Sequence, residues 1–233
     1  MSTNAFLLSI AKASELLSKA EVRSHYNTIV NLPHNYVNQV RDLSYTQLWK
    51  KHNENFWYHV KFSDQSLILF LDDSFKFIMS PFSKMETLDE YECRIRQELF
   101  DNGYSLEEIE EYIEDIDVQY MSYIDTELTF GSYTPVRVDN HPEQYHASYH
   151  PMTHIHIGHD NESRIPLKKI MTPYAFAGFI LATFYPKEWD RIRKEDKITE
   201  QDYRLLNDNL VSVPHYNQEL WCTTEEELRF YLV

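Results

Sequence analysis

Three short apolar runs follow one another closely in the first third of the chain, and they restrict its fold more than any other feature. They cover Phe56 to Phe62, Leu67 to Leu71 and Phe75 to Met79, and short polar turns separate them. Runs of this length and spacing are typical of strands that pair as an antiparallel meander. We therefore expect a mostly antiparallel sheet that begins in this region.

Helical patterns lie on both sides of these strands. Residues 4–31 repeat Ala, Leu and Ile at helical spacing, and a short helix is expected around Tyr45 to Lys51. Thr172 and Pro173 suit the cap and the first position of a helix that continues to Tyr185, and further helical patterns follow at about 187–208 and 223–231. Helices at both ends of a mostly antiparallel sheet predict the α+β fold class.

A pair of helices is expected between the meander and the rest of the sheet. Thr87 with Glu90, and Ser105 with Glu108, have the spacing of capping boxes, which mark the starts of helices. Gly103 suits the end of the first helix. We interpret the chain, residues 1–233, as a single α+β domain with a helical insertion at about 85–118.

The negative charge of the chain is concentrated in this insertion. Between Glu86 and Val118, thirteen acidic side chains oppose only Arg94 and Arg96, so this segment carries −11 of the total of −15 and the remainder only −4. The acidity therefore does not exclude nucleic acid from the rest of the surface. The segment itself has two interpretations, a solvated helical face or a docking surface for a basic protein partner.

Histidines gather in the segment from Arg137 to Pro166, which we take as the functional centre. Six of the eleven histidines lie at positions 141–159. We expect a long β region from Gln119 to Arg137 and a short strand from Met152 to Gly158. Alternation along that strand places His154 and His156 side by side on one face and the β-branched residues on the other, which is the natural core face.

A histidine pair of this kind supports three chemistries. The two imidazoles can act as base and acid across a phosphodiester. They can bind a divalent metal, for which His150, His154, His156 and His159 are the candidate ligands with Asp139 as a further donor. They can also polarise an oxyanion together with an arginine.

Charged residues near the pair complete the predicted site. Arg137 and Asp139 share one strand face, just before a turn at Asp139 to Pro142, and Arg164 follows the histidine strand. We expect the arginines to hold phosphate and the carboxylate to orient a histidine. The predicted catalytic residues are His154, His156, Arg137, Asp139 and Arg164.

Several functional classes have no support in the sequence. It lacks the glycine-rich GxGxxG and GxxxxGK[ST] patterns, so no nucleotide cofactor is expected, and no cofactor is required beyond the open alternative of a metal ion. The most apolar stretch, Tyr174 to Tyr185, is too short to span a bilayer, and no signal peptide is recognisable. With only two distant cysteines, Cys93 and Cys222, we expect a cytoplasmic protein with free thiols and no membrane partner.

Two families share parts of this sequence. Arg137-Val138-Asp139-Asn140, the His/Pro-rich stretch and His154-Ile155-His156-Ile157-Gly158 resemble small bacterial toxins of the TumE type. The span from His154 to Pro166, with the helix that starts Pro173-Tyr174-Ala175-Phe176, resembles the uncharacterised bacterial family called domain of unknown function 2290. The first resemblance implies a toxin that acts on RNA.

These observations lead to two functional hypotheses of different classes. The first is a toxin-like or antiviral-defence effector, a histidine-based phosphodiesterase directed at RNA. The second is a non-catalytic subunit of a defence or toxin–antitoxin complex that docks a basic partner through the acidic segment Glu86 to Val118.

Overall fold

The computed structural model describes residues 3–83, 85–130, 133–146, 149–159 and 163–213. It divides into two compact units, one formed by residues 1–80 and 134–233 and the other by residues 81–133. The α+β class is confirmed, with an antiparallel sheet and helices at both ends. The expected helix at 223–231 and Cys222 lie outside the described residues.

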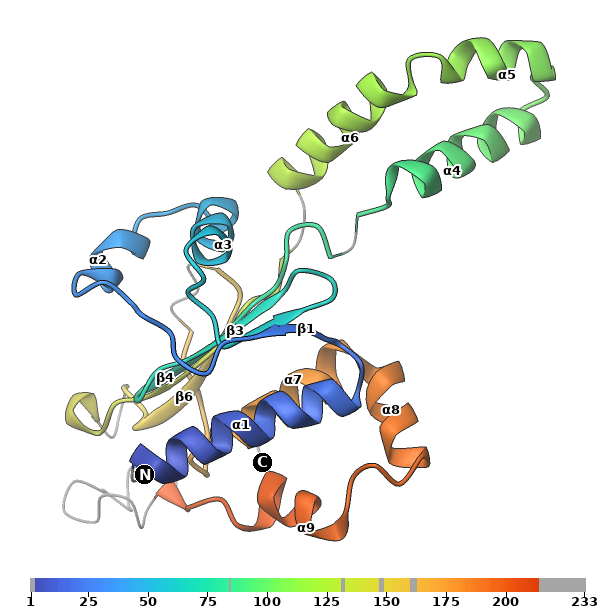
Figure 1. Ribbon diagram of the computed structural model, residues 1–233. Helices are drawn as coiled ribbons and strands as arrows, with labels where there is room; N and C mark the ends of the chain where they lie inside the picture. Colours follow the sequence, from blue (N-terminus) through green and yellow to red (C-terminus); the bar gives the residue numbers. More distant parts are fainter. Residues whose placement is uncertain (1–2, 84, 131–132, 147–148, 160–162, 214–233) are drawn as a thin grey trace. The chain divides into compact units, whose positions relative to one another are not determined.

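The larger unit is built on a seven-stranded antiparallel sheet in which each strand pairs with the next one in sequence (Figure 1). The strands are β1 (Arg23–Tyr26), β2 (Val60–Phe62), β3 (Leu67–Phe70), β4 (Ser74–Ile78), β5 (Val136–Asn140), β6 (Thr153–Ile157) and β7 (Ile165–Pro166). The second unit is inserted between β4 and β5, so two neighbouring strands are separated by a long stretch of sequence.

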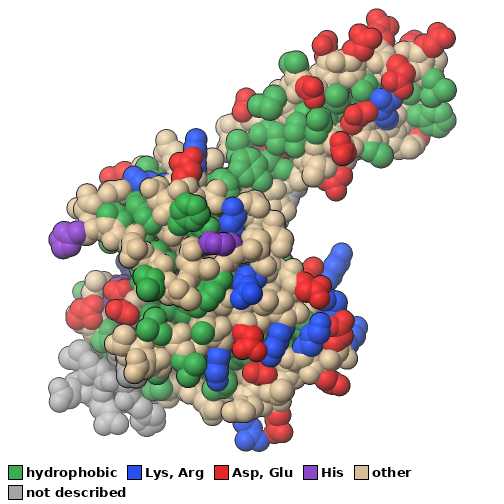
Figure 2. All heavy atoms as spheres, in the orientation of Figure 1, with side chains coloured by type: hydrophobic (Ala, Val, Ile, Leu, Met, Phe, Trp, Pro, Cys, Tyr) green, Lys and Arg blue, Asp and Glu red, His purple; other side chains and the backbone are tan. Residues whose placement is uncertain are grey.

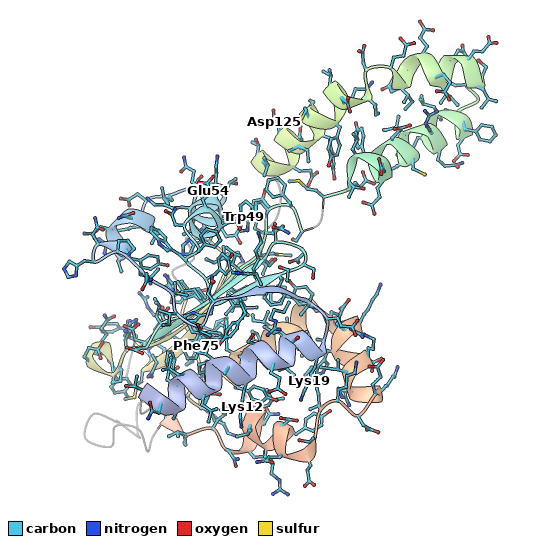
Figure 3. The ribbon with its side chains drawn as sticks, in the orientation of Figure 1. Lys12, Lys19, Trp49, Glu54, Phe75 and Asp125 are labelled. Atoms are coloured by element: carbon cyan, nitrogen blue, oxygen red, sulfur yellow. The ribbon has the colours of Figure 1, made fainter. Side chains whose placement is uncertain are left out.

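One face of this sheet carries the main core. It is covered by α1 (Thr3–Lys19) and α7 (Pro173–Phe184), and α8 (Pro186–Lys194), α9 (Glu200–Tyr203) and a π-helical turn (Arg204–Asp208) follow α7 (Figure 1). Phe75 points from β4 toward α1 and packs on Phe6 and on Phe176 of α7 (Figure 3). Alternation explains this face, because Val138 and Ile155 point to it from β5 and β6.

The opposite face is covered only in part, by α2 (Tyr36–Val40) and α3 (Tyr45–Glu54). Tyr36, Val40 and Trp57 pack there on Leu69 of β3 and form a second, smaller cluster. Because these helices cover only part of this face, the polar side chains of β4, β5 and β6 border on an open pocket there.

The unit of residues 81–133 is a helical structure with its own core. It contains α4 (Leu88–Asp101), α5 (Leu106–Ile113) and α6 (Ile116–Phe130), and both predicted capping boxes are formed, at Thr87 and Ser105. Tyr91 and Ile109 are buried in its core. Its acidic side chains are spread over the visible face, among apolar ones (Figure 2).

Two sequence predictions were wrong about local structure. The β region expected from Gln119 to Arg137 is helix α6 as far as Phe130, and only its end, from Val136, belongs to strand β5. The helix forms because Ile116, Tyr120 and Tyr123 recur at helical spacing and pack in one cluster with Tyr91. The first helix ends at Lys19 instead of continuing to residue 31, since residues 23–26 pair with β2 as strand β1.

Candidate functional site

Six polar side chains form two rows across three neighbouring strands, on the partly covered face of the sheet. Strand register places one row on Ser74, Asp139 and His154, and the next row on Lys76, Arg137 and His156. In each row the first residue comes from β4, the second from β5 and the third from β6. The intervening residues of the same strands point into the main core, so this arrangement follows from alternation and register alone.

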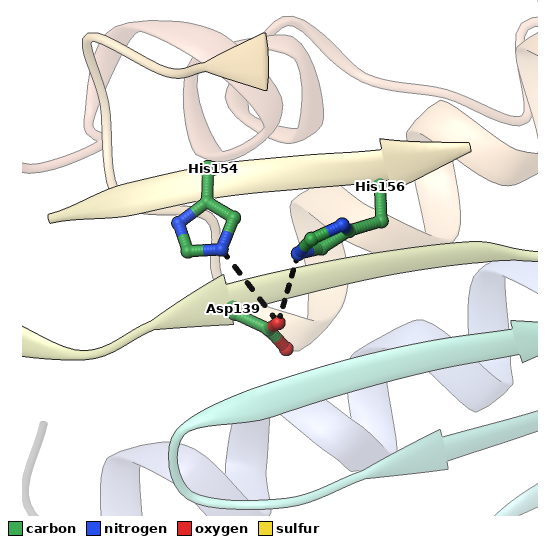
Figure 4. Close-up of side chains that lie close together, drawn as sticks. All are labelled: Asp139, His154 and His156. Carbon is green, nitrogen blue, oxygen red and sulfur yellow. Dashed lines mark ion pairs between the residues drawn. The ribbon is translucent and has the colours of Figure 1, made fainter. Parts of the chain in front are cut away.

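The carboxylate of Asp139 is the centre of this group (Figure 4). Its Oδ2 lies 2.8 Å from Arg137 Nε, 3.4 Å from His156 Nε2 and 3.8 Å from His154 Nε2. Its Oδ1 accepts a hydrogen bond of 2.7 Å from the hydroxyl of Ser74. Arg137 and Asp139 share one strand face, as the sequence predicted, and the pairing of β5 with β6 places the histidine pair on the same face.

These groups are buried, although they are polar. His154 is 1% exposed, His156 5% and Asp139 6%, whereas the Arg137 side chain reaches solvent. Burial by itself favours the neutral form of the Asp139 carboxyl. The hydrogen bonds from His156 and Ser74 and the charge of Arg137 together outweigh it and hold the pKa of Asp139 well below its usual range. Asp139 is therefore an anion at neutral pH.

The tautomer of His154 is set by the backbone. Its Nδ1 lies 3.1 Å from the carbonyl oxygen of Pro151, which can only accept, so Nδ1 carries the proton. Burial, with the neighbouring His156, lowers the pKa of His154 to about 4. At neutral pH the ring is uncharged, and its Nε2 presents a lone pair toward Asp139 and His156. The Nε2 atom of His154 can therefore donate its lone pair to a bound cation or accept a hydrogen bond, but it has no proton to donate.

A pocket of about 280 Å³ opens beside this centre. Arg41, Lys76 and Arg137 supply positive charge to its lining, which also includes His156 and His159. No carboxylate is present among the described residues that line it. Lys76 Nζ donates to the hydroxyl of Tyr36 (3.3 Å) and lies over its ring. Burial and, to a smaller extent, the charge of Arg137 lower the pKa of Lys76 to about 8, against the opposing charges of Asp139 and Asp73.

The other predicted residues lie around this centre. His150 packs edge-on against His154, with 5.1 Å between ring centroids, and its pKa is lowered by burial and by the charge of Arg164. Arg164 itself is exposed. His159 points to the α3 side, where its Nε2 donates to the carbonyl of Leu43 (3.1 Å).

One group of donor atoms in the described part of the chain is arranged as in a metal site. It consists of Asp139, His154 and His156, whose ligand atoms all lie within 4.8 Å of one another. His150 and His159, which the sequence also suggested as ligands, do not belong to it. The geometry thus reduces the four candidate histidines to two and retains Asp139, which the sequence had suggested as a further donor.

Sequence reasoning missed Ser74, Lys76 and Arg41. The signal for the first two was present, since polar Ser74 and Lys76 alternate with Phe75 and Phe77. Their proximity to Asp139 could not be inferred, because the pairing of β4 with β5 bridges the whole helical insertion. Arg41 follows α2, a short helix that the sequence did not indicate.

Comparisons with known proteins identify a family and nothing about its chemistry. The model of the family DUF2290, described as an uncharacterized conserved protein, matches residues 14–216. No curated protein and no solved structure matches the chain. The comparisons give no support to the local resemblance to TumE-type toxins. Because the family match covers most of the sequence, including every strand of the sheet, the chain belongs to DUF2290.

Proposed function

We propose that this protein hydrolyses phosphodiester bonds in RNA at the centre formed by Asp139, His154 and His156. The observation that carries the proposal is the pairing of Lys76 with Arg137, directly opposite each other on β4 and β5, at the edge of the His–Asp group. Like charges in this position destabilise a sheet. The ion pair of Arg137 with Asp139 offsets part of this repulsion, and an anion bound in the pocket would offset more of it.

Phosphate is the anion that suits this pocket best. Arginine and lysine side chains are the usual protein ligands of phosphate, and a guanidinium can hold two of its oxygens. Arg41, Lys76 and Arg137 approach the pocket from α2, β4 and β5, and no carboxylate among the described residues forms an ion pair with Lys76. A phosphodiester in the pocket would lie against His156.

The chemistry then needs a group that activates the attacking oxygen. In hydrolysis a water oxygen attacks phosphorus, the bond from phosphorus to the leaving sugar oxygen breaks, one proton leaves the water and one reaches the leaving oxygen. His156, which lines the pocket, would accept the proton of the attacking water and, once protonated, pass a proton to the leaving sugar oxygen, while Arg137 would stabilise the charge that develops on phosphate oxygens. His154 is neutral, so it does not serve as the general acid.

A cleavage assay tests this proposal. Wild-type protein should cleave a labelled single-stranded RNA, and His156→Ala should slow cleavage by about 100-fold or more, since general acid–base groups contribute factors of that size. The matched control is His34→Ala, because His34 is an exposed histidine outside the site. Equal rates of RNA cleavage by folded wild type and folded His156→Ala would refute the proposal. Cleavage of DNA but not of RNA would refute the assignment of RNA as the substrate.

A toxin-like or defence role would follow from such an activity. Expression of the wild-type chain in bacteria is then expected to stop growth, and expression of His156→Ala is not.

No helix in the described residues has both the length and the apolar character needed to cross a membrane.

We also propose a second function, docking of a basic protein partner, because residues 81–133 form a separate compact unit. Exposed apolar side chains such as Leu106 and Val118 accompany its carboxylates. Charge reversal should use Glu107, Glu111 and Glu114, which are exposed and outside the capping boxes, whereas Glu108 caps α5 and Glu110 binds Arg96. Unchanged recovery of a basic partner by the reversed variant would contradict docking there.

A further inference from the structure

We propose that Asp139, His154 and His156 bind one divalent transition-metal ion, such as Zn²⁺ or Mn²⁺, through one carboxylate oxygen and two imidazole nitrogens. This inference deepens the proposed hydrolysis and rests on it for the role of the ion. The binding itself is argued from geometry and does not depend on the substrate.

The spacing of the donor atoms suits a small metal ion. The Nε2 atoms of His156 and His154 lie 3.4 Å and 3.8 Å from Asp139 Oδ2. Ligands bound at roughly 2.0–2.1 Å in a tetrahedral site stand about 3.3 Å apart, which is close to both distances from Oδ2, and all three donor atoms lie within 4.8 Å of one another. Two imidazoles with one carboxylate are ligands of Zn²⁺, Mn²⁺ and Fe²⁺, whereas Ca²⁺ and Mg²⁺ prefer oxygen.

The hydrogen-bond partners of His154 and Asp139 hold these ligands in the tautomer and orientation that a metal ion requires. The carbonyl of Pro151 accepts the Nδ1 proton of His154, which leaves Nε2 as the electron donor. The hydroxyl of Ser74 donates to Asp139 Oδ1 and thereby directs Oδ2 toward the histidines. Supporting contacts of these two kinds are typical of histidine and carboxylate ligands in metal sites.

The positions of His156 and Arg137 determine where a metal ion can bind next to Asp139. Oδ2 of Asp139 lies 2.8 Å from Arg137 Nε and 3.4 Å from His156 Nε2. A metal ion bound between Oδ2 and His156 Nε2 would move the His156 proton from Nε2 to Nδ1. Since His156 and Arg137 also line the pocket, a remaining coordination position would face the bound phosphodiester. A water there would ionise near neutral pH and supply the attacking oxygen, so with the ion bound the ion would activate the water in place of His156.

Metal binding by the full chain, purified without a histidine tag and stripped with a chelator, tests the inference. Titration with Zn²⁺ or Mn²⁺ alone, followed by calorimetry and elemental analysis, should give about one ion per chain. Asp139→Asn and His154→Gln should lose stoichiometric binding, and Ser74→Ala should weaken it about 10- to 100-fold. His34→Ala, which removes an exposed histidine outside the site, is the matched control and should bind as wild type.

The outcomes separate the metal site from the hydrolysis. Metal bound at one ion per chain without RNA cleavage would support the site and refute the proposed reaction. RNA cleavage at full rate by stripped protein, with no ion bound, would overturn the metal site and leave the reaction standing. Equal binding by wild type and the folded Asp139→Asn variant would also overturn it. A rise in melting temperature with metal, seen in wild type but not in His154→Gln, supports the assignment.

Discussion

The substitution Ser74→Ala examines the contact that fixes Asp139. The Ser74 hydroxyl is buried and donates to a buried, ionised carboxylate at 2.7 Å. Hydrogen bonds to charged groups contribute about 1.5–3 kcal/mol, so the variant should lose that much free energy of unfolding at pH 7. Water cannot easily replace the donor, because the Asp139 side chain is only 8% exposed.

A double-mutant cycle gives the size of this interaction. In the Asp139→Asn background the acceptor is uncharged, so Ser74→Ala should cost only about 0.5–1.5 kcal/mol. Urea unfolding of the four proteins measures both values. Ser24→Ala serves as the control, since its hydroxyl bonds to backbone carbonyls from an exposed position, and we expect it to cost about 0.5 kcal/mol. Equal costs of Ser74→Ala in both backgrounds would refute the reasoning.

Three further predictions concern acid stability, the core and the pocket. Burial lowers the pKa of His52 and of His59 to about 4, so the stability that their neutral forms supply is complete above about pH 6.5 and is lost as pH falls toward 4. Urea unfolding should therefore give a free energy of unfolding at least about 3 kcal/mol lower at pH 5 than at pH 7. An unchanged urea midpoint would contradict this. Phe176→Ala should cost about 3–5 kcal/mol in the same assay, because Phe176 is fully buried against Phe70 and Phe75, whereas exposed Phe100→Ala should change stability by less than about 0.5 kcal/mol. Lys76→Met should weaken RNA binding, measured by fluorescence anisotropy, and reduce the slope of log affinity against log salt concentration by about 0.7. The control Lys12→Met lies on α1, which covers the other face of the sheet (Figure 3), and should leave that slope unchanged.

The sequence was sufficient to predict which candidate site residues share a strand face, because this depends on strand alternation. Apolar Ile155 between His154 and His156, and Val138 between Arg137 and Asp139, fixed which side chains share a face. The α+β class and the capped helices followed from equally local signals.

The parts of the fold and of the candidate site that the sequence did not predict depend on tertiary structure. The segment of α6 alternates polar and apolar residues after Tyr123, which favoured a strand, but packing of Tyr120 and Tyr123 on Tyr91 stabilises a helix there. Likewise, no local signal indicates that Ser74 and Lys76 lie beside Asp139 and Arg137, because strand order across a long insertion is decided by the whole sheet.

Asp139 connects every part of the proposed centre, so its isosteric replacement is the most direct test. The measurement is the single-turnover rate of RNA cleavage by Asp139→Asn, compared with wild type and with Asp72→Asn, an exposed aspartate at the end of β3. We predict a rate at least about 100-fold lower for Asp139→Asn and unchanged for Asp72→Asn. A folded Asp139→Asn protein that cleaves RNA within about twofold of the wild-type rate would contradict a functional centre at this carboxylate.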